Sequence, residues 1–475
     1  MSYLPGMPGM RSQDARRIAA LVLLSLIPLH GCGVIVRHGQ AALETVRAGG
    51  LVHPGRIAPL DDSEKQWAKT AWRYFSNNTA PETGLVSGQD RGQTVSVWEM
   101  ADYLAALVSA RRLELIDANE FDQRLSQFLG FLGRMDLVDG QAPNRLYSTV
   151  TGRRLDANGQ PGETGWSAVD LARLMLWLRI AGEHFPAYQE YLDKAVYRLR
   201  LCNVIDQCGR LYAGARQGDQ VLRSQEGRLG MEEYAAAGYQ TWGYRATEAA
   251  LVDPADPVQV DNRTLWADRR DPRQPGGEKV VIQTTPYVLT GIELGWDSRL
   301  LPGRTAAMIR EQSETVYRVQ EDRWRREGIY SARAEHQSLA SPYRLTDSIF
   351  ANGYAWNTLS DTGQWYPRLG LVSTKAVFGL WVLWDTDYTD RLMDVTRSLF
   401  DKDRGWYEGR YEATGAYERA ITASTNAMVL ESLLYKTTGP LLRQRAPDGY
   451  FSKAMANPFS RPEPCPAVPC PACAH

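Results

Sequence analysis

The sequence predicts an all-α protein that folds as an (α/α)6 toroid over residues 61–445. Two kinds of helical segment roughly alternate along the chain. One kind is apolar on nearly every face, as in a buried helix, and the other is amphipathic, as in a helix that covers it. No fixed sequence period supports the alternative, a stacked helical-repeat rod. The apolar segments are 96–109, 166–181, 234–243, 286–296, 373–384 and 424–435; the amphipathic segments are 62–75, 119–134, 186–201, 305–327 and 387–400.

Local signals support these elements in chain order. The first helix, "DDSEKQWAKTAWRYF", starts at an Asp/Ser cap. Loops rich in Gly and Pro separate the later helices. Because six apolar segments have only five amphipathic partners, we expect the sixth covering helix between residues 245 and 285. The alternative for that stretch is a set of short strands with a large irregular loop.

The composition argues against a nucleic-acid partner and suits carbohydrate. The 475 residues carry a formal net charge of −1, whereas nucleic-acid binding needs concentrated positive charge. The chain has 14 Trp and 23 Tyr against 10 Phe. Trp and Tyr combine a flat apolar face with a polar edge, which suits a partly hydrated groove, although large helical proteins also use Trp in their cores.

The N-terminus has the features of an export signal. Three arginines precede an apolar run at 18–29, which is too short to span a bilayer as a helix of about 20 residues. The sequence LHGC follows and resembles a bacterial lipobox, which implies a signal peptide at 1–31, lipidation of Cys32 and a tether at 32–60. Gly33 implies sorting to the periplasmic face of the outer membrane. The alternative is an ordinary cleaved signal in which Cys32 is incidental.

The remaining cysteines are expected to meet an oxidising compartment. Cys202 and Cys208 are close enough in sequence to close a short disulfide loop. Cys465, Cys470 and Cys473 lie in a Pro-rich tail, 446–475, and form no complete zinc set. The proline spacing predicts a disordered, extended tail.

Other reaction classes lack the residues that they need. Only His184 and His336 lie in the body of the domain, and no HxH or HExxH pairing occurs, so zinc chemistry and histidine-based acyl transfer are poorly supported. No GxxxxGK phosphate loop is present. Cleavage of a glycosidic bond needs two carboxyl groups and neither a metal nor a cofactor. We therefore expect no metal and no cofactor.

If successive helices run antiparallel, all inner helices start at one face, and acids and rings before them gather there. The candidate catalytic residues are Glu226, Glu232, Glu99 and Asp347. The candidate substrate-binding residues are Trp98, Trp166, Arg228, Tyr239, Trp242, Tyr287, Trp406, Tyr407, Glu408 and Asn426.

Each acid also has a structural interpretation. Glu226 suits a salt bridge with Arg228 or a helix cap, and Glu232 suits the positive end of a helix dipole. Asp170, with Arg173 three residues on, is typical of a buried ion pair.

Four stretches resemble one bacterial family, catalogued as domain of unknown function 3131. "EGRLGMEEYAAAGYQTWG" is similar to its EGRxGYEQYAAxGF signature, and similar agreement occurs in "TGLVSGQDRGQTVSVWEMADYLAAL", "STKAVFGLWVLW" and "RGWYEGRYEATGAYERAITASTNAMVLESLLY". The resemblance spans about residues 62 to 440 and implies a glucoamylase-like six-hairpin toroid, many of which act on glucans. The chain departs from the family in Glu99 for Asp, Met231 for Tyr and Glu233 for Gln.

Taken together, the sequence predicts an exported lipoprotein that acts on a polysaccharide or oligosaccharide. The expected activity is a glucanase-like glycoside hydrolase that uses two carboxylates as general acid and base. The alternative is a non-catalytic glycan-binding lipoprotein that aids exopolysaccharide export or assembly.

Overall fold

The computed structural model describes residues 55–252, 255–270, 280–296, 299–443, 450–457, 459 and 468–469, all within the unit Val52–His475. The expected signal peptide, Cys32 and most of the tether lie outside the described residues. Within these ranges, no helix combines the length and the apolar character that crossing a bilayer requires.

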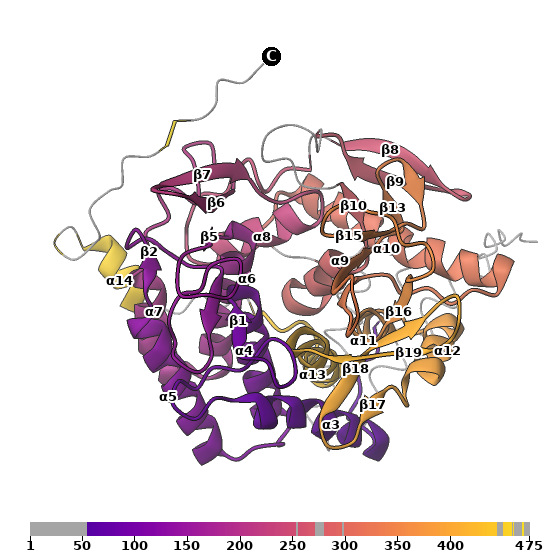
Figure 1. Ribbon diagram of the computed structural model, residues 1–475, viewed down its shortest axis with the longest axis horizontal. Coiled ribbons are helices and arrows are strands. Elements are labelled where there is room, and N and C mark those ends of the chain that lie inside the picture. Colours follow the sequence, from indigo (N-terminus) through magenta and orange to yellow (C-terminus); the bar gives the residue numbers. More distant parts are fainter. Residues whose placement is uncertain are drawn as a thin grey trace, which may run out of the picture. The chain divides into compact units, whose positions relative to one another are not determined.

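Six helical segments contact one another in a closed circuit (Figure 1). Each packs against the next along the chain, and the last packs against the first. Most side chains of these segments are buried, as the apolar segments predicted. We call them the inner helices: α4 (Val97–Arg112), α6 (Ala168–His184), α8 (Met231–Gln240), α9 (Thr285–Leu289) with its π-helical continuation η2 (Thr290–Leu294), α11 (Thr374–Leu383) and α13 (Ala423–Thr438).

Five amphipathic helices cover the inner helices. α5 contacts α4, α7 contacts α6, α10 contacts α9, α12 contacts α11, and α3 contacts both α13 and α4. Each buries one stripe of side chains, such as Phe121, Leu125 and Phe128 in α5. Their bounds are α3 (Asp62–Asn78), α5 (Ala118–Arg134), α7 (Gln189–Tyr197, after the short η1, Pro186–Tyr188), α10 (Gly303–Glu327) and α12 (Asp387–Thr396).

A β-hairpin lies between α8 and α9 in the chain, where the sixth covering helix was one of two expectations. Strands β8 (Ala255–Val260) and β9 (Arg263–Asp268) pair antiparallel, and β9 packs on α10. Val260 and Leu265 are fully buried, and Asp261 adopts a positive φ of 56° in the two-residue turn, as tight hairpin turns require. The alternative expectation of short strands is therefore confirmed.

Short strands precede every inner helix, in addition to those expected around 245–285, so the chain is mainly rather than purely helical. These strands are β1 (Thr94–Ser96), β5 (Gly165–Trp166), β7 (Gln220–Gln225), β10 (Val281–Ile282), β16 (Leu371–Ser373) and β19 (Tyr417–Ile421). Four of these six strands have only two or three residues, which is too short to leave an alternating pattern in a sequence. We call the N-terminal ends of the inner helices, with these strands and their partners, the rim.

The strands pair in small antiparallel sheets. β1 pairs with β4 (Leu146–Ser148), and β5, β6 (Tyr212–Gln217) and β7 form one sheet. β18 (Gly405–Tyr411) pairs with β16, β17 (Phe400–Asp401) and β19. β12 (Arg344–Asp347) lies between β11 (Glu335–Gln337) and β15 (Thr358–Ser360). β13 (Phe350–Ala351) lies between β10 and β14 (Tyr354–Ala355), and β2 (Leu137–Val138) pairs with β3 (Ala142–Pro143).

A buried ion cluster joins four of the inner helices. The Arg173 guanidinium on α6 contacts Asp102 of α4, Glu293 of η2 at 3.2 Å and Glu431 of α13 at 2.8 Å. Each of the four side chains is at most 2% exposed. Arg173 thus pairs with carboxylates of other helices rather than with Asp170. We call these four residues the hub.

The domain extends beyond both of its expected boundaries. Arg56 donates its backbone N–H to Val382 and Ala58 to Lys436, so the last residues of the expected tether are part of the fold. At the other end, α14 (Tyr450–Ala456) packs on α7 and carries Phe451 against Trp242. Part of the tail 446–475 therefore forms α14, and the expectation of a disordered, extended chain stays a prediction for the rest of the tail. Cys202 and Cys208 are each disulfide-bonded, and their pairing with one another stays a prediction.

Candidate functional site

Three partly exposed carboxyl groups lie at the rim. Glu99 is in the first turn of α4, Asp170 is in the first turn of α6, and Glu335 lies on β11. Asp102 is close enough to raise the pKa of Glu99, Asp170 and Lys375, the last of which binds Glu335. A common electrostatic neighbour indicates that groups from distant parts of the sequence converge. We call Glu99, Asp170 and Glu335 the rim acids.

Asp170 is a carboxyl group that keeps its proton unusually well. Burial, and after it the nearby Glu226 carboxylate, raises its pKa to about 6 against the opposing effect of Arg145. Its backbone N–H donates to the Ser167 hydroxyl at 3.0 Å, which caps α6. A carboxyl group in this state can donate a proton near neutral pH.

Glu335 has the opposite character. Burial alone would raise its pKa, but Lys375 Nζ at 2.6 Å and the Thr285 hydroxyl at 2.7 Å hold the pKa below its usual value. Lys375 is buried at the start of α11, whereas the Glu335 side chain is 38% exposed. Glu335 is therefore an ionised carboxylate that a ligand can reach.

Glu99 combines a cap with a shifted pKa. Its carboxylate accepts the Ser96 backbone N–H at 2.7 Å, and Ser96 Oγ accepts the Glu99 N–H at 3.2 Å, which is a capping box. Burial raises the pKa of Glu99, and the Asp102 carboxylate adds to this rise. The hydrogen bonds with Ser96 and the charge of Arg344 act in the opposite direction. The carboxyl group remains partly exposed, so Glu99 can serve α4 and a ligand together.

Glu226 is buried and holds the start of α6. Its carboxylate accepts the Ser167 hydroxyl at 2.9 Å, the Val169 N–H at 3.2 Å and the Ala168 N–H. Arg145 lies 3.4 Å from the same group. The sequence suggested either a salt bridge with Arg228 or a helix cap. Glu226 forms the cap, on α6 rather than on α8, the helix that follows it in the chain.

Glu232 and Asp347 are also buried in ion pairs. Glu232 contacts Arg270 at 2.6 Å, and burial raises its pKa to about 7, against the opposing effect of Arg270. Asp347 is fully buried, accepts the Leu371 N–H at 2.9 Å and lies 3.0 Å from His336 Nδ1. Neither carboxylate is one of the rim acids. Each is held by partners within the protein, Arg270 for Glu232 and His336 for Asp347.

Most of the candidate sugar-binding rings belong to the core. Trp166, Tyr239, Trp242, Tyr287 and Trp406 are at most 5% exposed. Trp98 and Tyr407 are the two that are partly exposed, and Trp98 lies over the hub guanidinium at 4.6 Å. Trp242 follows the C-terminal end of α8, away from the rim.

The remaining polar candidates make internal contacts. Arg228 donates to Gln225 at 2.6 Å and to the Gly227 carbonyl at 2.7 Å. Glu408 accepts the Thr425 hydroxyl at 2.7 Å. Asn426 accepts the Trp406 N–H at 2.8 Å. All three candidates are buried, and Glu408 and Asn426 stabilise the start of α13.

Sequence reasoning missed Glu335 and its partner Lys375. Glu335 lies in a three-residue strand with no helix behind it, so no motif marked it. Lys375 stands in "STKA", where Ser373 and Thr374 suggest only a helix start. A buried lysine in the first turn, where the helix dipole disfavours a cation, was the available signal.

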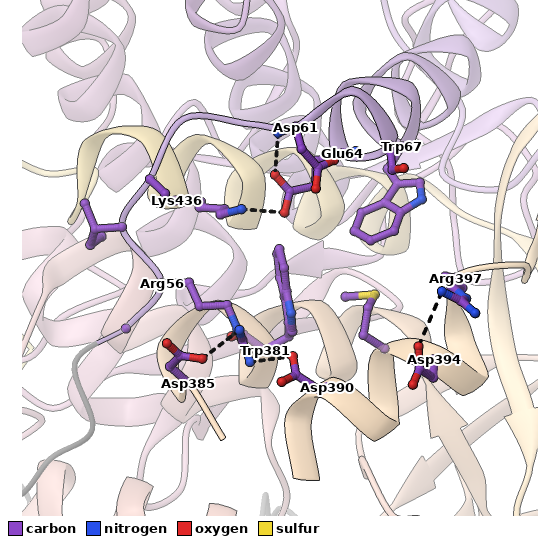
Figure 2. A pocket seen from close by; sticks show the side chains of 15 residues that line it. Arg56, Asp61, Glu64, Trp67, Trp381, Asp385, Asp390, Asp394, Arg397 and Lys436 are labelled. Carbon is purple, nitrogen blue, oxygen red and sulfur yellow. Dashed lines mark hydrogen bonds and ion pairs between the residues drawn. The ribbon is translucent and has the colours of Figure 1, made fainter. Parts of the chain in front are cut away.

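A pocket of about 660 Å³ lies at the other end of the inner helices (Figure 2). Trp381 near the end of α11 and Lys436 near the end of α13 line it. Several of the charged groups drawn there meet charges of opposite sign: Arg56 contacts Asp385 at 2.7 Å and Asp390 at 2.8 Å, and Lys436 contacts Glu64. We call this region the far end, and its ion pairs suit a role in stability.

Solved structures with the same fold handle carbohydrates. A candidate glucoamylase from Bacteroides fragilis is 15% identical, with a TM-score of 0.58, and the match covers 86% of this chain and 97% of that one. The endo-β-1,2-glucanase of Chitinophaga pinensis, solved with sophorotriose and glucose, is 14% identical with a TM-score of 0.57. That match covers 81% of this chain and 95% of the glucanase. The cellobiose 2-epimerase of Bacillus thermoamylovorans is 12% identical with a TM-score of 0.50. That match covers 79% of this chain and 98% of the epimerase.

These likenesses show a glucoamylase-like fold. No curated protein matches the sequence. The sequence pattern of one family matches residues 66–439, which is most of the described domain. The chain belongs to that family, described as protein of unknown function (DUF3131).

Proposed function

We propose that the protein is a glycoside hydrolase of a β-glucan, built on an (α/α)6 toroid, with Asp170 as general acid and Glu335 as general base. The observation that carries this proposal is the opposite perturbation of two accessible carboxyl groups at one rim. Burial and Glu226 keep the proton on Asp170, whereas Lys375 and Thr285 keep it off Glu335. Carboxyl pairs whose pKa values are pushed apart are typical of acid and base assignments in glycosidases.

In the proposed reaction, Asp170 protonates the glycosidic oxygen as the bond to the anomeric carbon breaks. Glu335 takes a proton from a water molecule whose oxygen attacks that carbon. Lys375 keeps the base ionised, and Glu226 keeps the acid protonated without touching the substrate. Trp98 offers a partly exposed ring over Arg173 as a face for the sugar.

Glu99 is the second candidate for the acid. Burial raises its pKa as it does that of Asp170, but its carboxylate is already engaged with the Ser96 N–H. A hydrogen bond that favours the charged form makes Glu99 the weaker proton donor. We therefore assign the acid to Asp170 and give Glu99 a role in holding sugar hydroxyls.

The substrate class rests on relatives. Two structures of the same fold are named for glucan or starch hydrolysis. The epimerase acts on a disaccharide, and the partly exposed acids and ring at the rim suit hydroxyl-rich ligands in general. We propose a β-glucan chain as the substrate.

The test measures new reducing ends on a panel of β-1,2-, β-1,3- and β-1,4-glucans. The wild type should release them from at least one glucan, and Glu335→Gln should not. Glu82→Gln, an exposed acid elsewhere, is the matched control and should retain activity. Binding of a glucan without release by the wild type would instead favour the alternative, a non-catalytic glycan-binding lipoprotein in exopolysaccharide export or assembly. Absence of both would exclude either function.

We also propose that the protein is anchored through a lipid on Cys32 at the periplasmic face of the outer membrane. The arginine-led apolar run and the LHGC sequence support this. Labelling with a palmitate analogue should tag the full-length wild type but not Cys32→Ser. Equal labelling of both would contradict the anchor.

A further inference from the structure

Residues 337–344, which run from the last residue of β11 to the first of β12, carry exposed apolar side chains beside the rim acids. We call these residues the rim hairpin. Leu339 is 62% exposed and Tyr343 is 66% exposed. Hairpin turns usually carry small polar residues or Gly at such positions. Two exposed apolar side chains on one turn therefore need a reason other than the turn itself.

The rim hairpin is fixed in place. Glu418 accepts the Ser338 hydroxyl at 2.8 Å and the Leu339 N–H at 3.3 Å. The Gln337 N–H donates to Glu408 at 3.3 Å, and the Ser338 N–H donates to the Tyr343 carbonyl at 3.0 Å. Because both sides are held by hydrogen bonds, the Leu339 and Tyr343 side chains start from a preorganised backbone. Preorganised contacts bind with less loss of entropy than mobile ones.

The same hairpin connects the rim acids in space. Its β11 strand begins with Glu335, four residues before Leu339. At its other side, Arg344 is close enough to lower the pKa of Glu99. The hairpin therefore runs between the base and the first turn of α4. A polymer held at the rim acids can reach its tip.

We propose that Tyr343, with Leu339 beside it, forms an outlying subsite that stacks on a sugar ring of a glucan chain, remote from the bond that is cleaved. This inference rests on the proposed function and makes it more specific: the substrate is an extended chain rather than a di- or trisaccharide. A Tyr ring offers a flat apolar face and a hydroxyl edge to a pyranose. Only glucan chains long enough to reach from the rim acids to Tyr343 gain the binding energy of this stacking contact.

The test compares a polymer with a trisaccharide of the same linkage, taken from the glucan that the wild type cleaves. Tyr343→Ala should lower kcat/KM on the polymer by about tenfold and on the trisaccharide by less than about twofold. Tyr343→Phe should retain the polymer rate because the ring remains. Tyr354→Ala removes a ring that is 71% exposed on the separate β13–β14 hairpin and should change neither rate.

Equal losses on polymer and trisaccharide, or an unchanged polymer rate in Tyr343→Ala, would overturn the subsite. Retardation of the protein in a native gel that contains soluble β-1,2-glucan separates this inference from the proposed catalysis. If the wild type cleaves no glucan but Tyr343→Ala is retarded less than the wild type, the hydrolase proposal fails and the subsite stands. If cleavage is normal and retardation is unchanged, the subsite fails alone.

Discussion

The rim and the far end of the inner helices are both rich in carboxylates, but they hold them differently. At the far end, Glu64 meets Lys436, and Asp385 and Asp390 meet Arg56. At the rim, Asp170 lies near another carboxylate, Glu226, and its pKa is raised to about 6. Glu335 is the one rim acid in contact with a cation, and that contact leaves its side chain 38% exposed.

This difference separates stabilising charges from reactive ones. A matched ion pair holds two segments together and keeps its carboxylate ionised, as Lys375 does for Glu335. A carboxyl group held near another carboxylate keeps its proton to higher pH, as Asp170 does beside Glu226. Among the described residues compared at the two ends, only those of the rim combine an ionised carboxylate with a protonated carboxyl group, so the rim is the better guide to acid and base chemistry.

The largest expected effect is on activity at the rim. Glu335→Gln should lower kcat/KM by about 10³-fold, because loss of a general base typically costs 10²- to 10⁴-fold. Asp394→Asn at the far end, where the side chain is 65% exposed, should change kcat/KM by less than about twofold. Reducing-end assays on the cleaved glucan check both, and similar losses in the two variants would remove the distinction between the ends.

A large effect on stability is expected at the far end. Lys436→Met leaves the buried Glu64 carboxylate, 4% exposed, without its cation. The free energy of unfolding should fall by about 3 kcal/mol, while kcat/KM of the folded protein should be unchanged. Urea denaturation gives the first quantity. The double variant Lys436→Met with Glu64→Gln should recover part of the loss, and an equal loss in single and double variants would show that the pair is unimportant.

The pH dependence of activity should report the acid. Asp170 must carry a proton, so kcat/KM should fall as pH rises through about 6, by about tenfold per pH unit above it. Glu226→Gln removes a neighbouring negative charge and should move this falling limb to lower pH, because the proton is then held less tightly. Stopped assays between pH 4 and 8 measure the limb. An unmoved limb in Glu226→Gln, with Asp170→Asn still active, would exclude Asp170 as the acid.

A smaller effect is expected on the pH dependence of stability. It comes from Glu233, whose buried carboxyl group takes no part in the proposed reaction. Burial, with a contribution from Glu232, raises its pKa to about 8. The folded state therefore binds this proton more tightly than the unfolded state, so stability is highest below the ordinary Glu pKa and falls as pH rises towards 8. Glu233→Gln, the residue of the family signature, should narrow the difference in Tm between pH 5 and pH 8. Parallel Tm curves for variant and wild type would contradict the shift.

The inner helices could be predicted because they are continuous apolar runs. α4, α6 and α11 are buried on all sides, and a buried helix of that length leaves an unambiguous signal in sequence. The hub pairing could not be predicted from spacing. Asp170 and Arg173 stand three residues apart on α6, but Arg173 points to Asp102 and to carboxylates that are distant in sequence.

The site was predicted less well than the fold. The motif around Glu226 marked the rim, yet its carboxylate caps α6, and Asp347 is fully buried beside His336. Glu99 was predicted and lies among the rim acids. Glu335 was not, because its character comes from Lys375 and Thr285, which approach it from other segments. Local sequence records which acids begin helices, but it does not record which acids a distant cation reaches.

The contact of α13 with α4 has a consequence for how the chain is made. α4 is synthesised early, and the helix that covers one of its sides is among the last to leave the ribosome. Until then, α4 lacks its contact with α13, and Arg173 lacks Glu431 although Asp102 and Glu293 precede it. Contacts between such distant segments form slowly. A late stop codon that removes α13 should therefore leave an aggregate rather than a smaller folded protein.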